Sequence, residues 1–210
     1  MSTRKERQAR TRELLMDSAA AVAAQRGIER ASLDEVAERA GFTKGAVYAN
    51  FASKEELFLA MLDAHFEARL DELDRIVSTE ADPDAQAREA AQGLMRVLEA
   101  HPAWHRLFFE FALYATRNEG FREQLVARYR SMRERLAGLL AERVERLGID
   151  PVLPPAEVAA MAFAMANGMA LERLLEPEAV PDTMFAEMMA TFFTGLRARA
   201  GVPPPPSGPS

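Results

Sequence analysis

Apolar residues recur at intervals of three and four through most of the chain, which is the period of an amphipathic helix. No segment alternates at a period of two, and Ala, Leu, Glu, Arg and Met outnumber the β-branched residues. The pattern therefore predicts an all-α protein of about nine helices. These helices are expected to span approximately residues 7–26, 33–40, 44–50, 54–78, 83–100, 102–117, 121–147, 156–175 and 183–200.

Residues 32–58 hold a dense series of helix start and stop signals. Ser32 and Ser53 each begin a Ser-x-x-Glu capping box, in which the serine and glutamate side chains bond to free backbone N–H groups. Gly41 is expected to end the first helix in a left-handed conformation, and Thr43 to cap the next. Two short helices joined by a tight turn predict a helix-turn-helix, which presents its second helix to the major groove of DNA.

This segment resembles the DNA-binding domain of the TetR (tetracycline-repressor) family of transcriptional regulators. The family pattern is a Ser- or Thr-led helix, Ala-Gly, a Thr/Ser-Lys/Arg-Gly turn, Tyr, an aromatic residue and Ser-Lys-Glu. The resemblance runs from about residue 12 to 62, and Asn50 and Ala23 depart from it, standing where many members have His and an aromatic. The matching residues are Ser32, Ala40, Gly41, Thr43, Lys44, Gly45, Tyr48, Phe51, Ser53, Lys54 and Glu55.

A recognition helix places its N-terminal residues at base edges, while flanking groups hold phosphates. The residues expected at the bases are accordingly Thr43, Lys44, Gly45 and Ala46. The resemblance implies phosphate contacts from Ser32, Tyr48, Asn50 and Lys54. Ser32 has a competing role as a helix cap, and packing against the first helix is the alternative for Tyr48.

The net charge of −6 taken alone argues against a nucleic-acid partner, but the charge is unevenly distributed. Residues 1–12 carry five Lys or Arg side chains against Glu6 alone. Local charge at the phosphates governs DNA affinity, so Arg4, Lys5 and Arg7 are expected to contact DNA from a basic arm. The alternative is a solvated leader without a DNA contact.

One helix-turn-helix reads few bases, and a two-fold pair binding a palindromic operator would read twice as many, which predicts a homodimer. The last two predicted helices are the expected interface. The first has small residues at helical spacing, and the second is apolar on more than one face and so must be buried on both sides. The interface residues are predicted to be Ala159, Ala162, Ala166, Met188, Phe192 and Phe193.

The resemblance also implies a small effector that binds the C-terminal part and releases the protein from DNA. Aromatic, Met and polar residues on the predicted helices supply candidate pocket walls, and Asn167 is notable because an amide in an apolar helix needs a partner. The sparse charge favours a mostly apolar effector, with plain core filling as the alternative. The candidates are His65, Trp104, His105, Phe108, Phe111, Tyr114, Met165, Asn167 and Met169.

The composition argues against several other classes of protein. The chain has no Cys, no Gly-rich phosphate loop and no recognisable Ser-His-Asp set, so neither an enzyme, a metal site nor a cofactor is expected. No apolar run is expected to approach the ~18 residues of a membrane span, which favours a cytoplasmic protein. A helical protein–protein adaptor and a transcriptional activator stay open as alternatives.

The expected organisation has three parts. Residues 1–53 would form the DNA-binding domain, and residues 54–200 an effector-binding and dimerisation domain. Residues 201–210 are rich in Pro, which cannot support a packed core, so a disordered tail is expected there.

Overall fold

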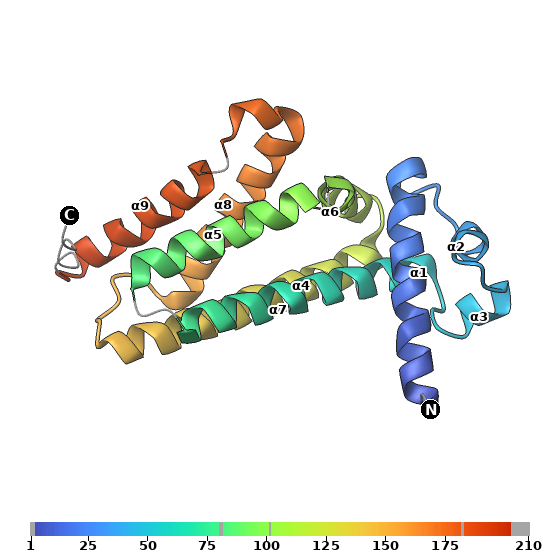
Figure 1. Ribbon diagram of the computed structural model, residues 1–210, viewed down its shortest axis with the longest axis horizontal. Helices are drawn as coiled ribbons and strands as arrows, with labels where there is room; N and C mark the ends of the chain where they lie inside the picture. The colour runs from blue at the N-terminus through green and yellow to red at the C-terminus, as the bar shows by residue number, and fades with distance from the viewer. Residues whose placement is uncertain (1–2, 80–81, 101, 182, 203–210) are drawn as a thin grey trace. The chain divides into compact units, whose positions relative to one another are not determined.

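The computed structural model describes residues 3–79, 82–100, 102–181 and 183–202, without the side chains of residues 79, 84, 98, 102, 103 and 105. Every element within these ranges is helical, which confirms the predicted all-α class (Figure 1). Most of the predicted tail lies outside the described residues. The helices are α1 (Arg4–Arg26), α2 (Leu33–Ala40), α3 (Lys44–Tyr48), α4 (Lys54–Thr79), α5 (Pro83–Ala100), α6 (Pro102–Ala115), α7 (Glu119–Leu147), α8 (Pro155–Leu175), the 3-10 turn η1 (Pro177–Ala179) and α9 (Met184–Arg199).

Two helices begin earlier than their patterns predict. The Thr3 side chain accepts a hydrogen bond from the Glu6 N–H and the Glu6 carboxylate returns one, so α1 already begins at Arg4. The predicted basic arm is therefore largely the first turns of a helix. Asn118 Oδ1 accepts the Phe121 N–H at 2.9 Å, which caps α7 and places Gly120 inside its first turn.

The chain forms two compact units, and α4 and α7 contribute residues to both. The first unit holds residues 1–67 and 101–129, and the second holds residues 68–100 and 130–210. Helix α6 belongs to the first unit because it packs against α1. This division by packing differs from the predicted division by function at residue 53, which stays a prediction.

The first unit is built around α1, against which α2 packs and α3 follows (Figure 1). Val47 of α3 and Phe51 after it are almost completely buried, which fixes α3 on this scaffold. Ala23 is fully buried where the family often has an aromatic. Phe58 of α4 and Phe111 of α6 meet edge to face with ring centroids 6.1 Å apart. The core thus joins the helix-turn-helix, α4 and α6 in one packed body.

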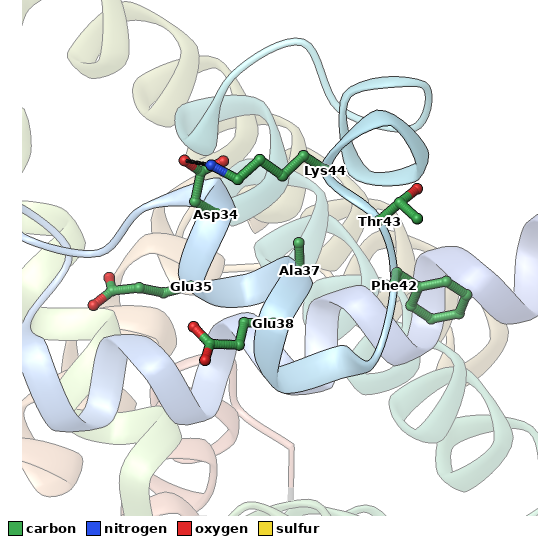
Figure 2. A pocket seen from close by; sticks show the side chains of 7 residues that line it. All are labelled: Asp34, Glu35, Ala37, Glu38, Phe42, Thr43 and Lys44. Carbon is green, nitrogen blue, oxygen red and sulfur yellow. Dashed lines mark hydrogen bonds and ion pairs between the residues drawn. The ribbon is translucent and has the colours of Figure 1, made fainter.

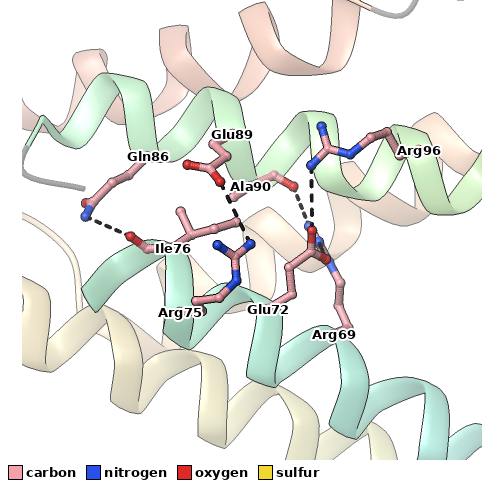
Figure 3. A network of polar contacts seen from close by, with 8 residues as sticks. All are labelled: Arg69, Glu72, Arg75, Ile76, Gln86, Glu89, Ala90 and Arg96. Carbon is pink, nitrogen blue, oxygen red and sulfur yellow. Dashed lines mark hydrogen bonds and ion pairs between the residues drawn. The ribbon is translucent and has the colours of Figure 1, made fainter. Parts of the chain in front are cut away.

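The second unit pairs α5 with α9 and seats α8 beside them (Figure 1). The buried Gln86 side chain of α5 donates to the carbonyl oxygen of Val77 at 3.0 Å, satisfying a carbonyl in the last turn of α4. Arg69 of α4 donates both to Glu72 and to the carbonyl oxygen of Ala90 on α5 (Figure 3). Burial of the guanidinium lowers the pKa of Arg69.

Helix α8 corrects the expectation that no segment is long and apolar enough to cross a membrane. Pro155–Leu175 reaches a mean hydropathy of 1.3 over 18 residues, and only 28% of that window is buried. Length and composition alone are weak evidence for a span. A helix with an exposed apolar face is also typical of a protein–protein interface.

Candidate functional site

The helix-turn-helix is held by the caps that the sequence predicts. Ser32 Oγ accepts the Glu35 N–H at 3.2 Å, and the Glu35 carboxylate bonds back to the Ser32 N–H. Gly41 takes the left-handed conformation with φ of 71°, and Thr43 Oγ1 accepts the Ala46 N–H at 3.2 Å. These local bonds set the direction in which α3 leaves the turn.

The outer surface of α3 presents most of the residues predicted to read DNA. Thr43, Lys44 and Gly45 are exposed, and Ala46 is half-buried. The Tyr48 side chain is 55% exposed and therefore does not pack into the core. This exposed row, carried on the buried anchors described above, is the candidate nucleic-acid interface.

Lys44 is engaged by a carboxylate of the neighbouring helix. Its Nζ lies 2.5 Å from Asp34 Oδ2, and this hydrogen bond together with the charge of Asp34 raises the pKa of Lys44. The pair lies at the edge of an open depression of about 470 Å³ (Figure 2). Its lining residues are Asp34, Glu35, Ala37, Glu38, Phe42, Thr43 and Lys44.

The other predicted phosphate contacts have partners within the protein. The Ser32 hydroxyl donates to Glu35 Oε2 at 3.2 Å, and the Asn50 amide donates to the carbonyl oxygen of Ala46 at 2.8 Å. Lys54 Nζ donates to the carbonyl oxygens of Ile28 and Glu29 at 3.2 and 2.7 Å. These groups would need to exchange or share their present bonds to reach a phosphate.

The predicted basic residues near the N-terminus all lie on α1. The side chains of Arg4, Lys5 and Arg7 are exposed. Arg12, farther along α1, has its guanidinium carbon 4.1 Å from the centre of the Phe51 ring and donates to the carbonyl oxygen of Asn50. Arg12 therefore fastens α1 to the end of the helix-turn-helix.

Helix α6 supplies a second set of polar bonds to the same scaffold, which the sequence interpretation missed. Glu110 Oε2 accepts the Ile28 N–H at 2.8 Å, and the Tyr114 hydroxyl donates to Glu55 Oε1 at 2.7 Å. Just beyond the end of α6, a guanidinium nitrogen of Arg117 lies 3.5 Å from Glu29 Oε2. Glu110 is a lone carboxylate within the apolar run 107–115. It could have indicated these bonds from the sequence, because a charge among apolar residues needs a partner.

The Tyr114–Glu55 bond perturbs both groups. Burial raises the pKa of Tyr114, and the bond to Glu55 raises it further. Burial also raises the pKa of Glu55, but the hydrogen bonds it accepts, first among them that of Tyr114, outweigh burial and leave its pKa lowered. Glu55 therefore remains a carboxylate and accepts a hydrogen bond from the Tyr114 hydroxyl.

Some of the predicted effector residues form an aromatic group in the first unit. The His65 and Trp104 ring centroids lie 4.7 Å apart, Trp104 and Phe111 lie 6.2 Å apart, and Phe108 stacks on Tyr129 at 5.6 Å. Trp104 Nε1 is buried without a hydrogen-bond partner among the described residues. The side chain of His105 lies outside the described residues.

The remaining predicted effector residues lie in the second unit. Met165, Asn167 and Met169 are on α8, with Met169 buried and the other two half-buried. The structure therefore divides the predicted set between two compact units.

The residues predicted at the dimer interface differ in how exposed they are. Ala159 and Ala162 are 0% and 8% exposed, because this face of α8 packs inside its own unit. Ala166, Met188, Phe192 and Phe193 are half-buried. The exposed large apolar side chains of α8 and α9 are instead Met161, Leu171, Leu175 and Met184.

Comparison with known proteins identifies relatives for both parts of the chain. Residues 15–61 match the family model described as bacterial regulatory proteins, tetR family, and residues 83–198 match that of the C-terminal part of BetI-type transcriptional repressors. YfiR of Bacillus subtilis, an uncharacterised HTH-type transcriptional regulator, is 29% identical over 171 residues, which cover 80% of this chain and 82% of YfiR.

Solved structures agree with these matches. A transcriptional regulator from Rhodococcus sp. Rha1 superposes with a TM-score of 0.67 at 28% identity, covering 92% of this chain and 99% of the other. SmeT in complex with triclosan superposes with a TM-score of 0.70 at 25% identity, covering 95% and 97%.

Proposed function

The chain belongs to the TetR family of transcriptional regulators, and from that premise we propose that it is a ligand-released repressor that binds a palindromic operator as a homodimer. The observation that carries the proposal is the exposed surface of α3 on a preformed scaffold. Its caps and buried anchors fix the backbone before DNA arrives, so little ordering free energy is lost on binding.

At the DNA, the N-terminal part of α3 would enter the major groove. Thr43, Lys44, Gly45 and Ala46 would face the bases, and the small size of Gly45 and Ala46 would allow close approach of the backbone. The exposed hydroxyl of Tyr48 would donate to a phosphate.

Other groups would contribute more phosphate contacts. The exposed cations of the first turns of α1 are Arg4, Lys5 and Arg7. Ser32, Asn50 and Lys54 would join them after exchanging or sharing their internal bonds. These contacts would position the protein without reading sequence.

The dimer would form through α8 and α9, as the sequence suggests, but with a different face of α8. Ala159 and Ala162 are already buried, whereas Met161, Leu171 and Leu175 lie exposed on the outer face. Pairing this face with a second copy would remove the apolar surface that gives α8 the composition of a membrane span. We place the protein in the cytoplasm as a DNA-binding regulator without enzymatic activity.

The effector would bind at the aromatic group of the first unit. SmeT has been solved with triclosan, and we propose a small, mostly apolar effector for this chain as well. The indole N–H of Trp104, which is buried without a partner in the part of the chain that the structure describes, would favour an effector with one hydrogen-bond acceptor. Release requires that the effector bind the DNA-incompetent conformation more tightly than the DNA-bound one.

Helix α6 offers a direct connection from that group to the helix-turn-helix. Trp104, Phe108 and Phe111 share the helix with Glu110 and Tyr114, which bond to the Ile28 N–H and to Glu55. A displacement of α6 would therefore change the support of the α1–α2 loop and of the start of α4.

The experiment is selection of bound sequences from a random duplex pool at near-physiological salt with purified full-length protein. Enrichment of an inverted repeat with half-sites about one helical turn apart would support a dimeric operator-binding regulator. Absence of enrichment, with protein that has been stripped of small molecules and refolded, would contradict the proposal and favour a helical adaptor.

A further inference from the structure

The Asp34–Lys44 ion pair joins the two helices of the helix-turn-helix at the surface. Asp34 lies in the first turn of α2 and Lys44 is the first residue of α3, and Figure 2 shows the lysine side chain reaching back to the carboxylate. The Lys44 side chain remains 68% exposed and the Asp34 side chain 48% exposed. A phosphate oxygen can therefore compete with Asp34 for the ammonium group.

The surroundings of this pair are acidic. Glu35 and Glu38 line the same depression, and Glu35 lies 3.3 Å from Arg26 while also serving the Ser32 cap. The side chain of Glu38 has no ion pair among the described residues. The cation nearest the start of the proposed recognition helix thus lies among carboxylates, which repel the phosphates of DNA.

Lys54 provides a contrast within the same unit. Its ammonium group donates to the carbonyl oxygens of Ile28 and Glu29, which are neutral acceptors, and its charge also acts on the neighbouring carboxylate of Glu55. Asp34, by comparison, cancels the charge of Lys44 at a distance of 2.5 Å. The two lysines are therefore held by different chemistry, and of the two only Lys44 donates a hydrogen bond to a carboxylate, which weakens its attraction for distant phosphates.

We propose that Asp34 is a specificity-determining residue that withholds Lys44 from DNA phosphates. The proposal rests on the proposed function. Binding to non-operator DNA depends almost entirely on phosphate contacts, whereas operator binding adds hydrogen bonds to base edges. On the operator Lys44 would face the bases and not a phosphate, so withholding it from phosphates weakens non-operator complexes by the larger share, and Asp34 raises the ratio of operator to non-operator affinity.

The test measures binding by fluorescence anisotropy to the selected operator and to a scrambled duplex over a series of salt concentrations. The variants are Asp34→Asn, Lys44→Gln, the double variant and Glu38→Gln. Glu38→Gln is the matched control, because it removes one negative charge from the same depression without breaking an ion pair to Lys44.

Asp34→Asn should raise affinity for the scrambled duplex about three- to tenfold and steepen its salt dependence by about 0.9 per protomer, the slope of one additional phosphate contact. Operator affinity should rise less, so the ratio of operator to non-operator affinity should fall. In the Lys44→Gln background, Asp34→Asn should leave both affinities and the slope unchanged, because Asp34 acts through Lys44.

Three results would overturn the proposal: an equal gain from Glu38→Gln, a gain from Asp34→Asn that persists without Lys44, or an unchanged salt slope. The first two would show general repulsion by acidic residues. The salt dependence of Asp34→Asn binding to scrambled DNA can be measured whether or not the wild type prefers an operator. Failure of the proposed function is therefore distinguishable from failure of this proposal.

Asp34 also lies where a negative charge favours the start of a helix, so folding must be controlled. Asp34→Ser, a second variant compatible with a helix N-terminus, should reproduce the change in slope. Unchanged helical circular dichroism in both variants would assign the effect to Lys44 and not to loss of α2.

Discussion

Glu110 on α6 accepts a hydrogen bond from the backbone N–H of Ile28 at 2.8 Å, across 82 positions of sequence. Ile28 directly follows Gly27, which ends α1 with a φ of 76°. The carboxylate thus satisfies a backbone donor in the loop between α1 and α2, and it ties that loop to the helix that carries the aromatic group.

Glu110→Ala should lower the free energy of unfolding by about 1–2 kcal/mol, because the partly buried Ile28 N–H loses its acceptor. Urea unfolding at fixed protomer concentration would measure the loss. Glu110→Gln keeps an acceptor oxygen and should recover most of the stability. A Gln variant as unstable as the Ala variant would contradict the assigned bond.

Tyr114→Phe removes the hydroxyl that donates to Glu55. It should cost about 0.5–1 kcal/mol at neutral pH, below the usual range for a bond to a charged group, because both side chains are partly exposed. The bond contributes to the lowered pKa of Glu55, so its stabilisation is present above the ordinary value of 4.5 and is lost as pH falls through the folded-state pKa.

The difference in unfolding free energy between wild type and Tyr114→Phe should therefore shrink in acid. Unfolding measured at several pH values between neutrality and the acid limit of folding checks this. A difference that stays constant through the titration of Glu55 would show that the hydroxyl stabilises the fold in another way.

Gly93→Ala should destabilise the second unit by about 1–2 kcal/mol despite the higher helix propensity of Ala. A Cβ at position 93 would lie 2.3 Å from Glu72 Oε1 and 3.0 Å from an Arg69 guanidinium nitrogen, so the Glu72 carboxylate must shift, which disturbs its ion pair with the buried Arg69 (Figure 3). Thermal unfolding would measure the effect.

Gly138→Ala is the matched control, because Gly138 lies within α7 and an added Cβ meets nothing within 4 Å. That substitution should stabilise the protein by about 0.5–1 kcal/mol through helix propensity alone. Equal stabilisation by both substitutions would mean that the Arg69–Glu72 pair contributes little.

Tyr48→Ala should weaken operator binding about 100-fold and leave the dimer intact. Each lost phosphate bond is worth about 1.4 kcal/mol, and a dimer loses two. The 55% exposure of Tyr48 predicts that folding is unaffected. Tyr48→Phe should weaken binding nearly as much, because the hydroxyl makes the contact. Unchanged operator affinity in the Ala variant would exclude this role.

The paired substitution Met161→Glu and Leu171→Glu should convert the dimer to monomer, since it places charges on the exposed apolar face of α8. Light scattering coupled to size exclusion would show the change in mass. Leu113→Glu is the control, because Leu113 of α6 is 66% exposed and lies in the other unit. A variant of α8 that remains dimeric would place the interface elsewhere.

The helices and the recognition motif could be predicted from the sequence because their signals are local. The Ser32 and Thr43 caps act over three residues, Gly41 acts through its own φ, and the apolar period repeats within one helix. The same locality explains the earlier start of α1, since the sequence at Thr3 and Glu6 already contains the capping box that the interpretation overlooked.

What the sequence by itself determined is therefore an all-α chain with a helix-turn-helix of the TetR type. Only the tertiary structure decided which polar groups meet: Glu110 with Ile28, Lys54 with the same loop, and Lys44 with Asp34. It also decided that Ala159 faces inward while Met161 faces outward. Such pairings depend on how separate helices pack, which no periodicity within a single helix encodes.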